Sequence, residues 1–299
     1  MNTAHRSARS AERDLAEWET HRPHLLGLAY RMLGDVARAE DMVQEAWIRW
    51  TGRSEEADDP RAYLVAVVTR LCLNELGSAR ARKEESRSDR LPEPVALDQS
   101  GTFQVEVLDD VSMALLVMLQ RLTPSERAVL LLHDVFDFGH ADIADLIGKT
   151  APASRKLLER ARSNIAAEKR LLSASREEHA RLLESFVKAA LEGDLESLLG
   201  LLADDAVLVT DGGPNGREVE GFRNLRAPLQ GASRVAQFIS TVSARGARTL
   251  ERELRELNGR PALLFRRDGA PFAALMLGVA EGRIHRVYFQ ADLSRLRRI

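Results

Sequence analysis

Cysteine is nearly absent from this chain, since Cys72 is the only one among 299 residues. A single cysteine excludes an intramolecular disulfide and fits a reducing compartment. Cys72 lies within an apolar helical pattern, which favours a buried thiol over a reactive one. No apolar run approaches the length of about 18 residues that a membrane span needs, and the polar N-terminus has no signal-peptide core. We therefore expect a cytoplasmic protein.

The sequence also lacks a large net charge of either sign, and it lacks a metal-binding motif. The net charge is −2, so the chain is not globally basic, although a local basic patch could still bind nucleic acid. The seven histidines are scattered without metal-ligand spacing, so we expect neither a metal nor a cofactor. The length suits about two or three domains.

Composition divides the chain into two helical blocks, a linker and a mixed C-terminal part. Residues 86–101 hold two prolines and no apolar periodicity, which indicates a linker. After residue 173, one further helix precedes apolar runs that are separated by Asp-Gly and Glu-Gly. Such dipeptides join antiparallel strands into a meander. The predicted fold class is multidomain, with two all-α domains followed by an α+β domain.

The helix expected over residues 35–50 has two different faces. An apolar stripe at helical spacing indicates core; it consists of Val36, Ala39, Val43, Ala46 and Trp50. A second face is acidic, hydrogen-bonding and partly apolar; it consists of Asp41, Gln44, Glu45 and Ile48. A face that is only solvated would more often interleave Lys and Arg. The residues alone leave a solvated face and a binding face as alternatives.

Residues 140–165 have the spacing of a helix-turn-helix. A short helix ends at Gly148, and a second begins with Pro152 in its first turn, where a missing N–H costs nothing. We expect Ile143, Ile147 and Leu157 to point inward. The outer face of the second helix is rich in arginine and lysine, as major-groove docking requires. Its members are Arg155, Lys156, Glu159 and Arg160, with Arg162 nearby.

One position disagrees with the helix-turn-helix motif. Ser154 falls where a helix-turn-helix normally buries a small apolar side chain, so a helical hairpin with a solvated basic end stays as the alternative. Upstream, Thr123 and Glu126 predict a capping box at the start of the preceding helix. His133 on that helix is expected to be partly buried and hydrogen-bonded rather than catalytic.

Three long stretches resemble one family. The stretches "HRPHLLGLAYRMLGDVARAEDMVQEAWIRW" (21–50) and "DDPRAYLVAVVTRLCLNELGSARARKE" (58–84) resemble region 2 of a bacterial sigma factor. The stretch "LTPSERAVLLLHDVFDFGHADIADLIGKTAPASRKLLERAR" (122–162) resembles region 4. Together they resemble an RNA polymerase sigma factor of the extracytoplasmic-function group of the sigma-70 family, over about residues 15–170.

The resemblance implies three contact sites. The helix at 35–50 would dock on the clamp helices of the largest subunit of core RNA polymerase, through Asp41, Gln44, Glu45 and Ile48. The loop at 51–59 and the helix that follows would hold the single-stranded −10 promoter element, through Asn74, Arg80, Arg82 and Lys83. The helix-turn-helix would read the −35 element as duplex, through Thr150, Arg155, Lys156 and Arg160. A disordered charged linker remains a second interpretation of residues 78–90.

The linker and the C-terminal part narrow the resemblance. "RLPEP" (90–94) resembles the "WLPEP" linker of the sigma-J type subgroup, with Arg90 in place of Trp. That subgroup carries a C-terminal SnoaL-like domain of the NTF2 fold, a curved cone of strands and helices. "TDGG" (210–213) resembles the subgroup's Asp-Gly-Gly-Gly-Lys motif, and the match ends at Pro214. We expect the domain to pack on region 2 or on the linker, through Leu91, Pro92, Pro94, Asp211, Gly212 and Gly213.

The sequence therefore predicts sigma region 2 at 15–88, a linker at 89–108, sigma region 4 at 109–172 and a SnoaL-like domain at 176–299. The expected function is transcription initiation without catalysis, with core RNA polymerase and promoter DNA as partners and with regulation in cis. We expect loss of the C-terminal domain to lower transcription, and loss of its basic tail after Gln290, which could reach the acidic docking face, to raise it.

A runner-up hypothesis places the activity in the C-terminal part. An NTF2-like domain that binds a small molecule, or acts as an isomerase, would then be fused to a helical DNA-binding module. The polar residues available for such a site are Asp204, Asp205, Asp211 and His285. Their spacing does not force an acid–base role, and a fold alone does not imply function.

Overall fold

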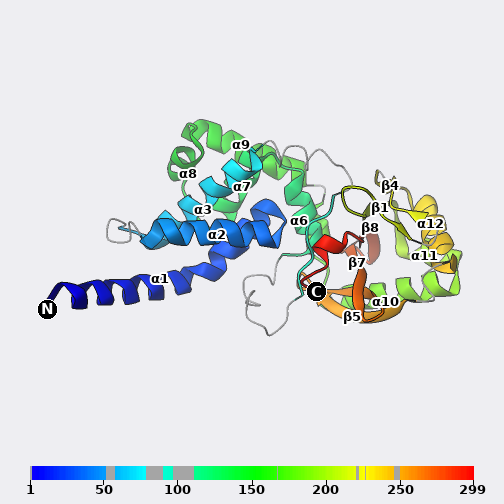
Figure 1. The fold of residues 1–299 in the computed structure, drawn as a ribbon. Helices are drawn as coiled ribbons and strands as arrows, with labels where there is room; N and C mark the ends of the chain where they lie inside the picture. The colour runs from blue at the N-terminus through cyan, green and yellow to red at the C-terminus, as the bar shows by residue number, and fades with distance from the viewer. Residues whose placement is uncertain are drawn as a thin grey trace. The chain divides into compact units, whose positions relative to one another are not determined.

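The computed structural model describes residues 2–51, 58–78, 90–96, 111–166, 168–219, 222–225, 227–245 and 250–299. The chain forms two compact units. The helical unit combines Met1–Arg82 with Leu119–Asn164, and the C-terminal unit combines Lys83–Met118 with Ile165–Ile299. Figure 1 follows the chain through both units by colour. The four domain boundaries drawn from the sequence stay a prediction.

The helical unit begins with three helices that pack on one another, α1 (Asn2–Leu33), α2 (Val36–Thr51) and α3 (Pro60–Leu76). The predicted apolar stripe of α2 is buried from Val36 to Trp50, as expected. Trp50 donates its indole N–H to the carbonyl oxygen of Asp14 at 3.1 Å, which joins α2 to α1. Cys72 is fully buried, and this burial raises the pKa of its thiol to about 12, so the predicted structural role fits.

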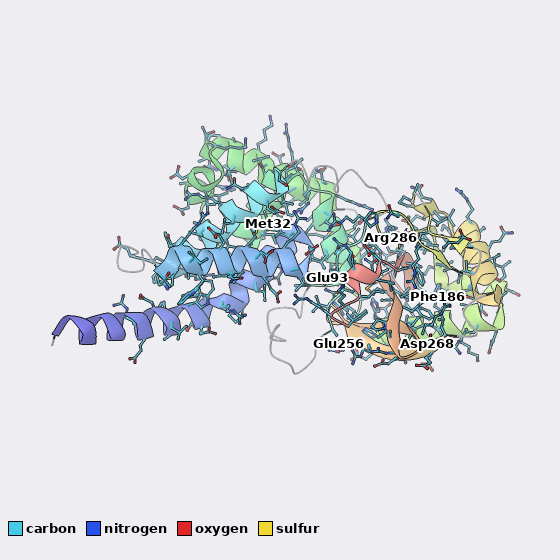
Figure 2. The ribbon with its side chains drawn as sticks, in the orientation of Figure 1. Met32, Glu93, Phe186, Glu256, Asp268 and Arg286 are labelled. Atoms are coloured by element: carbon cyan, nitrogen blue, oxygen red, sulfur yellow. The ribbon has the colours of Figure 1, made fainter. Side chains whose placement is uncertain are left out.

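The rest of the helical unit comes from later in the chain. It holds the end of α6 (Met113–Gln120), then α7 (Pro124–Asp134), α8 (His140–Ile147) and α9 (Ala151–Ala166). The predicted capping box at Thr123 and Glu126 is present at the start of α7. Arg127 of α7 is buried and donates to the carbonyl oxygens of Leu119 and Met32; Met32 is labelled in Figure 2. Since Met32 belongs to α1, this guanidinium joins α7 to α1.

The C-terminal unit is built on a six-stranded mixed sheet, in the order β4-β1-β8-β7-β6-β5. Its strands are β1 (Leu202–Asp211), β4 (Leu229–Gln230), β5 (Glu251–Leu257), β6 (Arg260–Arg267), β7 (Ala270–Ala280) and β8 (Arg283–Gln290). The predicted meander is β6, β7 and β8, with left-handed turn residues at Asp268 and Glu281 and at the glycines after them. A separate pair is formed by β2 (Glu218–Val219) and β3 (Phe222–Arg223).

Two expectations for this unit were incomplete. One helix was expected after residue 173, whereas α10 (Arg176–Glu192), α11 (Leu195–Leu201) and α12 (Ala232–Arg245) are present there, besides the short 3₁₀ turn η3 (Leu293–Arg295). Another 3₁₀ turn, η2 (Lys169–Leu172), precedes that residue. The meander also has an earlier strand, β5, joined to β6 by Asn258 and Gly259 with positive φ. The Asn-Gly dipeptide was the available signal for that turn.

Each face of the sheet has its own core, because successive side chains of a strand point to opposite faces. The pocket face packs against α10, α11 and α12, with Leu208, Val287 and Phe289 in its core. The linker face carries Val209 and Tyr288 and packs against Leu91, Met113 and Leu171. This α+β architecture resembles the NTF2-like fold that the sequence predicts. No helix in the described part of the chain is long and apolar enough to cross a membrane.

Candidate functional site

The second face of α2 is open to solvent. Asp41 and Gln44 are exposed, and Ile48 is one of the few large apolar side chains left exposed, at 59%. Glu45 is half-buried and accepts from Arg49 at 3.0 Å, one turn later on the same helix. An exposed pair of this kind stabilises by less than about 1 kcal/mol. The carboxylates therefore remain available to an external cation, and their predicted role in polymerase binding stays a prediction.

The exposed side of α3 carries polar groups toward its C-terminal end. Asn74 is exposed, as the predicted −10 contact requires, and Arg70 is exposed one turn earlier on the same side. Arg70 was not among the predicted contacts, although the i,i+4 spacing places it on the same side of the helix as Asn74. The other predicted −10 contacts, Arg80, Arg82 and Lys83, lie outside the described residues.

The helix-turn-helix has the predicted turn. Gly148 ends α8 in the left-handed conformation, with φ 66° and ψ 41°, and its N–H donates to the carbonyl of Ala144. Its inner face differs from the prediction by one residue at two places. Leu146 and Leu158 are buried, whereas Ile147 and Leu157 are half-buried. The crossing of α8 and α9 decides which of two adjacent apolar residues faces inward, and periodicity alone does not fix that crossing.

Ser154 occupies the expected inner position and is fully buried. Its hydroxyl lies 3.0 Å from Nδ1 of His140, so the polar group that made this position unusual is hydrogen-bonded. His140 stacks on His133, with ring centroids 4.9 Å apart. Partial burial, with the nearby charges of His133, Arg155 and Arg162, lowers the pKa of His140. The lowered pKa favours the neutral form of the imidazole that contacts Ser154.

His133 also contacts an ion pair. Its Nδ1 lies 2.8 Å from Oδ1 of Asp134, and Arg162 donates to the same oxygen at 2.6 Å. Burial opposes ionisation of Asp134, but the hydrogen bonds and charges of Arg162 and His133 prevail and lower its pKa. Arg162 is thus held by α7, and His133 is half-buried and paired, as the sequence analysis expects.

The outer face of α9 presents the predicted −35 contacts. Arg155, Lys156 and Arg160 are exposed. Thr150 is exposed just before the helix, where its hydroxyl accepts weakly from the N–H of Ala153, at 3.4 Å. The structure therefore brings these four residues to one helix and its N-terminus, and their contacts with DNA stay a prediction.

The predicted linker motif is an extended segment buried on the C-terminal unit. Residues 91–95 are all buried, including Pro92, Pro94 and the labelled Glu93 (Figure 2). Asn258 accepts from the N–H of Val95 at 3.2 Å and donates its own N–H to the carbonyl of Val95 at 2.8 Å. Gln290 donates to the carbonyl of Pro92 at 3.4 Å. The segment is held through its backbone as well as through Leu91 and Val95.

Asp211 is the buried carboxylate that receives this linker. Its Oδ2 accepts from the N–H of Leu91 at 2.9 Å, and its Oδ1 accepts from the N–H of Gly213 at 2.9 Å. Gly213 has φ 83°. A Cβ on Gly212 would lie 2.7 Å from the backbone nitrogen of Arg217, so both glycines are needed for this loop. Of the predicted regulatory residues, Leu91 on the linker and Asp211 in the loop are therefore in direct contact.

The end of the chain completes the linker site. Arg295 is buried and donates to the carbonyl of Leu91 at 2.8 Å, and Leu296 is buried in the same core as Leu91. From the sequence, this basic tail was expected to be able to reach the docking face of α2. The structure assigns Arg295 to the linker instead, because its partner lies 204 positions away in sequence and no local pattern shows it.

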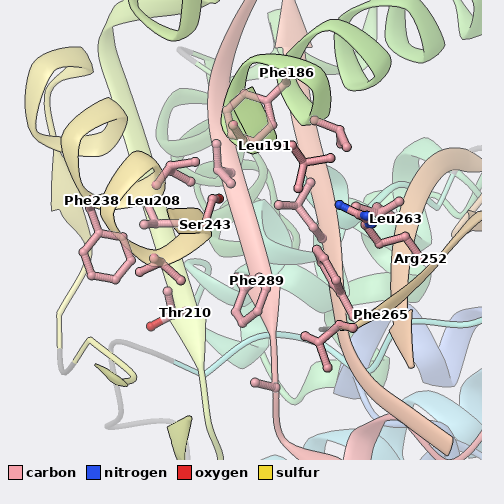
Figure 3. Close-up of a pocket in the computed structure, with 18 of the residues that line it drawn as sticks. Phe186, Leu191, Leu208, Thr210, Phe238, Ser243, Arg252, Leu263, Phe265 and Phe289 are labelled. Carbon is pink, nitrogen blue, oxygen red and sulfur yellow. The ribbon is translucent and has the colours of Figure 1, made fainter. Parts of the chain in front are cut away.

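A cavity of about 140 Å³ opens on the pocket face, lined by α10, α12 and strands of the sheet (Figure 3). None of the four polar residues considered for an isomerase site lines it. Asp211 faces the linker, and Asp205 contacts His285 at 2.8 Å and Arg170 at 2.9 Å. Within the described part of the chain, the lining has no carboxylate and no cluster of groups could hold a metal ion.

Comparisons with known proteins agree with this architecture. Residues 18–82 match the family model for sigma-70 region 2, and residues 112–165 match that for sigma-70 region 4. The ECF RNA polymerase sigma factor SigJ of Mycobacterium tuberculosis is 36% identical over 230 residues, covering 76% of this chain and 72% of that protein. The probable ECF RNA polymerase sigma factor SigI of the same species is 33% identical over 291 residues, 94% of each protein. The crystal structure of M. tuberculosis SigJ matches with a TM-score of 0.75 and 29% identity, over 94% of this chain and 97% of that one.

Proposed function

This chain belongs to the extracytoplasmic-function sigma factors of RNA polymerase, and from that membership we propose that its C-terminal domain regulates it in cis through the linker. Sigma factors of this family bind core RNA polymerase and direct it to promoter DNA, and they are not enzymes. We place this work in the cytoplasm, where the polymerase acts.

The assignment of contacts within the proposal follows the exposed faces. We assign core-polymerase docking to Asp41, Gln44, Glu45 and Ile48 because this face of α2 combines carboxylates with an exposed apolar side chain. Asn74, with Arg70 beside it, is assigned to the −10 element. The exposed cations of α9 are assigned to the −35 element, since arginine and lysine suit phosphate oxygens and guanine edges.

The buried hydrogen bond between Asp211 and Leu91 carries the regulatory proposal. Leu91 lies between the two sigma regions in sequence, so fixing it shortens the free chain that separates them. Within the helical unit, α7 packs on α1 and α3, and Arg127 of α7 donates to the carbonyl of Met32 on α1. Reading two separate promoter elements requires the regions to move apart. A held linker opposes this movement, and partial release of the linker favours it.

The test is promoter-dependent runoff transcription with core polymerase and the variant Asp211→Asn. An asparagine keeps the shape of the side chain but has no charge. It also has only one oxygen, so its NH₂ group must face one of the two backbone N–H donors, Leu91 or Gly213. Asparagine therefore weakens the hold on Leu91. We expect transcription to rise at least about twofold, the change that a loss of about 0.5 kcal/mol gives.

Asp204→Asn is the matched control, because Asp204 lies on the same strand and is exposed. It should transcribe as the unmodified protein does. Equal transcription by Asp211→Asn and Asp204→Asn, at equal protein concentrations, would refute regulation through this contact.

A further inference from the structure

The cavity on the pocket face has the size of one aromatic ring. Its volume is about 140 Å³, and an apolar protein cavity of about 150 Å³ binds benzene. Figure 3 shows the rings of Phe186, Phe238, Phe265 and Phe289 around it, carried by α10, α12, β6 and β8. Burying an aromatic ring among such side chains is favourable because it removes apolar surface from water.

One cation lies at the edge of this apolar space. Arg252 on β5 is the charged residue among the described lining residues, and it is exposed. Within the described part of the chain no hydrogen bond or ion pair occupies its guanidinium. The hydroxyl oxygen of Thr210 accepts from the N–H of Leu225 at 2.8 Å, and Thr210 carries no charge. The wall thus offers an apolar interior and a donor for an anion at the opening, and it offers no carboxylate to a cation.

We propose that this cavity binds a small carboxylic acid with a single aromatic ring. The ring lies among the phenylalanines and the carboxylate accepts from Arg252. A guanidinium binds a carboxylate through two parallel hydrogen bonds, so the charge fixes the orientation while the ring supplies the buried area. Ligand pockets are typically lined by apolar side chains, with a few polar groups that fix the orientation of the ligand.

The cavity and the linker share two strands. On β1, Thr210 lines the cavity and the next residue, Asp211, binds Leu91. On β8, Phe289 lines the cavity and the next residue, Gln290, binds Pro92. A ligand that orders these strands therefore also holds the linker more firmly, and the acid acts as an effector of the regulation proposed above. This coupling rests on that proposed function, whereas binding itself does not.

Calorimetric titration of the full-length protein with benzoate tests the binding. Benzyl alcohol is the neutral probe of similar shape. Arg252→Gln should weaken benzoate binding about tenfold, which is the usual effect of losing a charged hydrogen bond, and should leave binding of benzyl alcohol unchanged within twofold. Arg255→Gln is the matched control, since Arg255 lies on the same strand but pairs with Glu253 at 2.8 Å.

A second variant tests the place of binding. Ser243 lines the cavity and is half-buried on α12, so Ser243→Phe should fill the space without disturbing the inner core and should abolish binding of both probes. Absence of benzoate binding to the unmodified protein would overturn the proposal. Benzoate binding that is equal in Arg252→Gln, or retained in Ser243→Phe, would overturn it as well.

Hydrogen exchange of residues 90–96 tests the coupling separately. Saturating benzoate should slow exchange of the Leu91 amide at least about threefold, because stronger holding lowers the frequency of local opening. Unchanged exchange despite measured binding would remove the effector role. Since the Asp211→Asn experiment uses no benzoate, failure of the regulatory proposal is distinguishable from failure of ligand binding.

Discussion

His179 is a buried imidazole on α10, and its Nε2 has no hydrogen-bond partner within the described residues. Burial, followed by the charge of Arg260, lowers its pKa from 6.5 to about 4. The unfolded chain therefore takes up a proton first as the pH falls below about 6.5, and the folded chain does so near pH 4. The free energy of unfolding therefore decreases as the pH falls from about 6.5 to about 4. The total decrease is about 3 kcal/mol at the lower pH.

Urea unfolding at pH 7.5 and pH 4.5 measures this contribution. His179→Leu should reduce the acid destabilisation of the C-terminal unit, since leucine has no proton to gain. His24→Gln is the control because His24 is exposed, and it should follow the unmodified protein. An identical pH dependence in all three proteins would show that His179 does not govern this window.

At the scale of single elements, α2 offers the sharpest test. Asp41→Arg combined with Glu45→Arg should weaken core-polymerase binding by about 2–5 kcal/mol, because two arginines would repel the basic side chains that the proposed docking places against this face. The fold should persist, since neither residue belongs to the buried stripe. Circular dichroism and a polymerase pull-down check both statements. Glu19→Arg on α1 is the control, and unchanged affinity of the double variant would rule out this docking face.

For α9, the base-reading role of Arg155 is measurable in holoenzyme. Arg155→Ala should cost about 1–3 kcal/mol of promoter binding and should relax specificity at one base position. A phosphate contact would instead weaken binding equally on all sequences. Affinity measured on a panel of −35 variants separates the two, with Arg181→Ala on α10 as the control.

The local elements were predictable from the sequence because neighbouring residues determine them. The stripe of α2, the capping box at Thr123 and the left-handed Gly148 each depend on residues within one or two turns. Burial of the linker was expected only from the family resemblance, because Asp211, Asn258 and Arg295 are far away in the chain. The parallel pairing of β1 with β8 was missed for the same reason.

At the scale of the whole molecule, deletion of residues 176–299 and deletion of the tail after Gln290 should have opposite effects. Met113 and Ala114 of α6 are buried in the linker-face core, so region 4 loses the support of its first helix when the domain is removed, and transcription should fall. Tail deletion removes Arg295 and Leu296 from the linker, and with them Ala291, whose N–H donates to the carbonyl of Asp211 at 2.7 Å. The hold on the linker is therefore weaker, and transcription should rise. Runoff transcription at equal concentrations checks both, and equal activity of the three proteins would exclude regulation in cis.

The contacts that hold the linker also depend on the order in which the chain is synthesised. Arg295, which holds Leu91, lies 204 residues further along the chain. At about 5–20 residues per second, translation reaches Arg295 roughly 10–40 seconds after Leu91. For most of that interval β8 is incomplete, so its pairing with β1 and the hydrogen bond of Gln290 to Pro92 do not yet exist. Every newly made molecule therefore passes through a stage in which the linker is not fully held, and a chain that terminates before β8 remains in it.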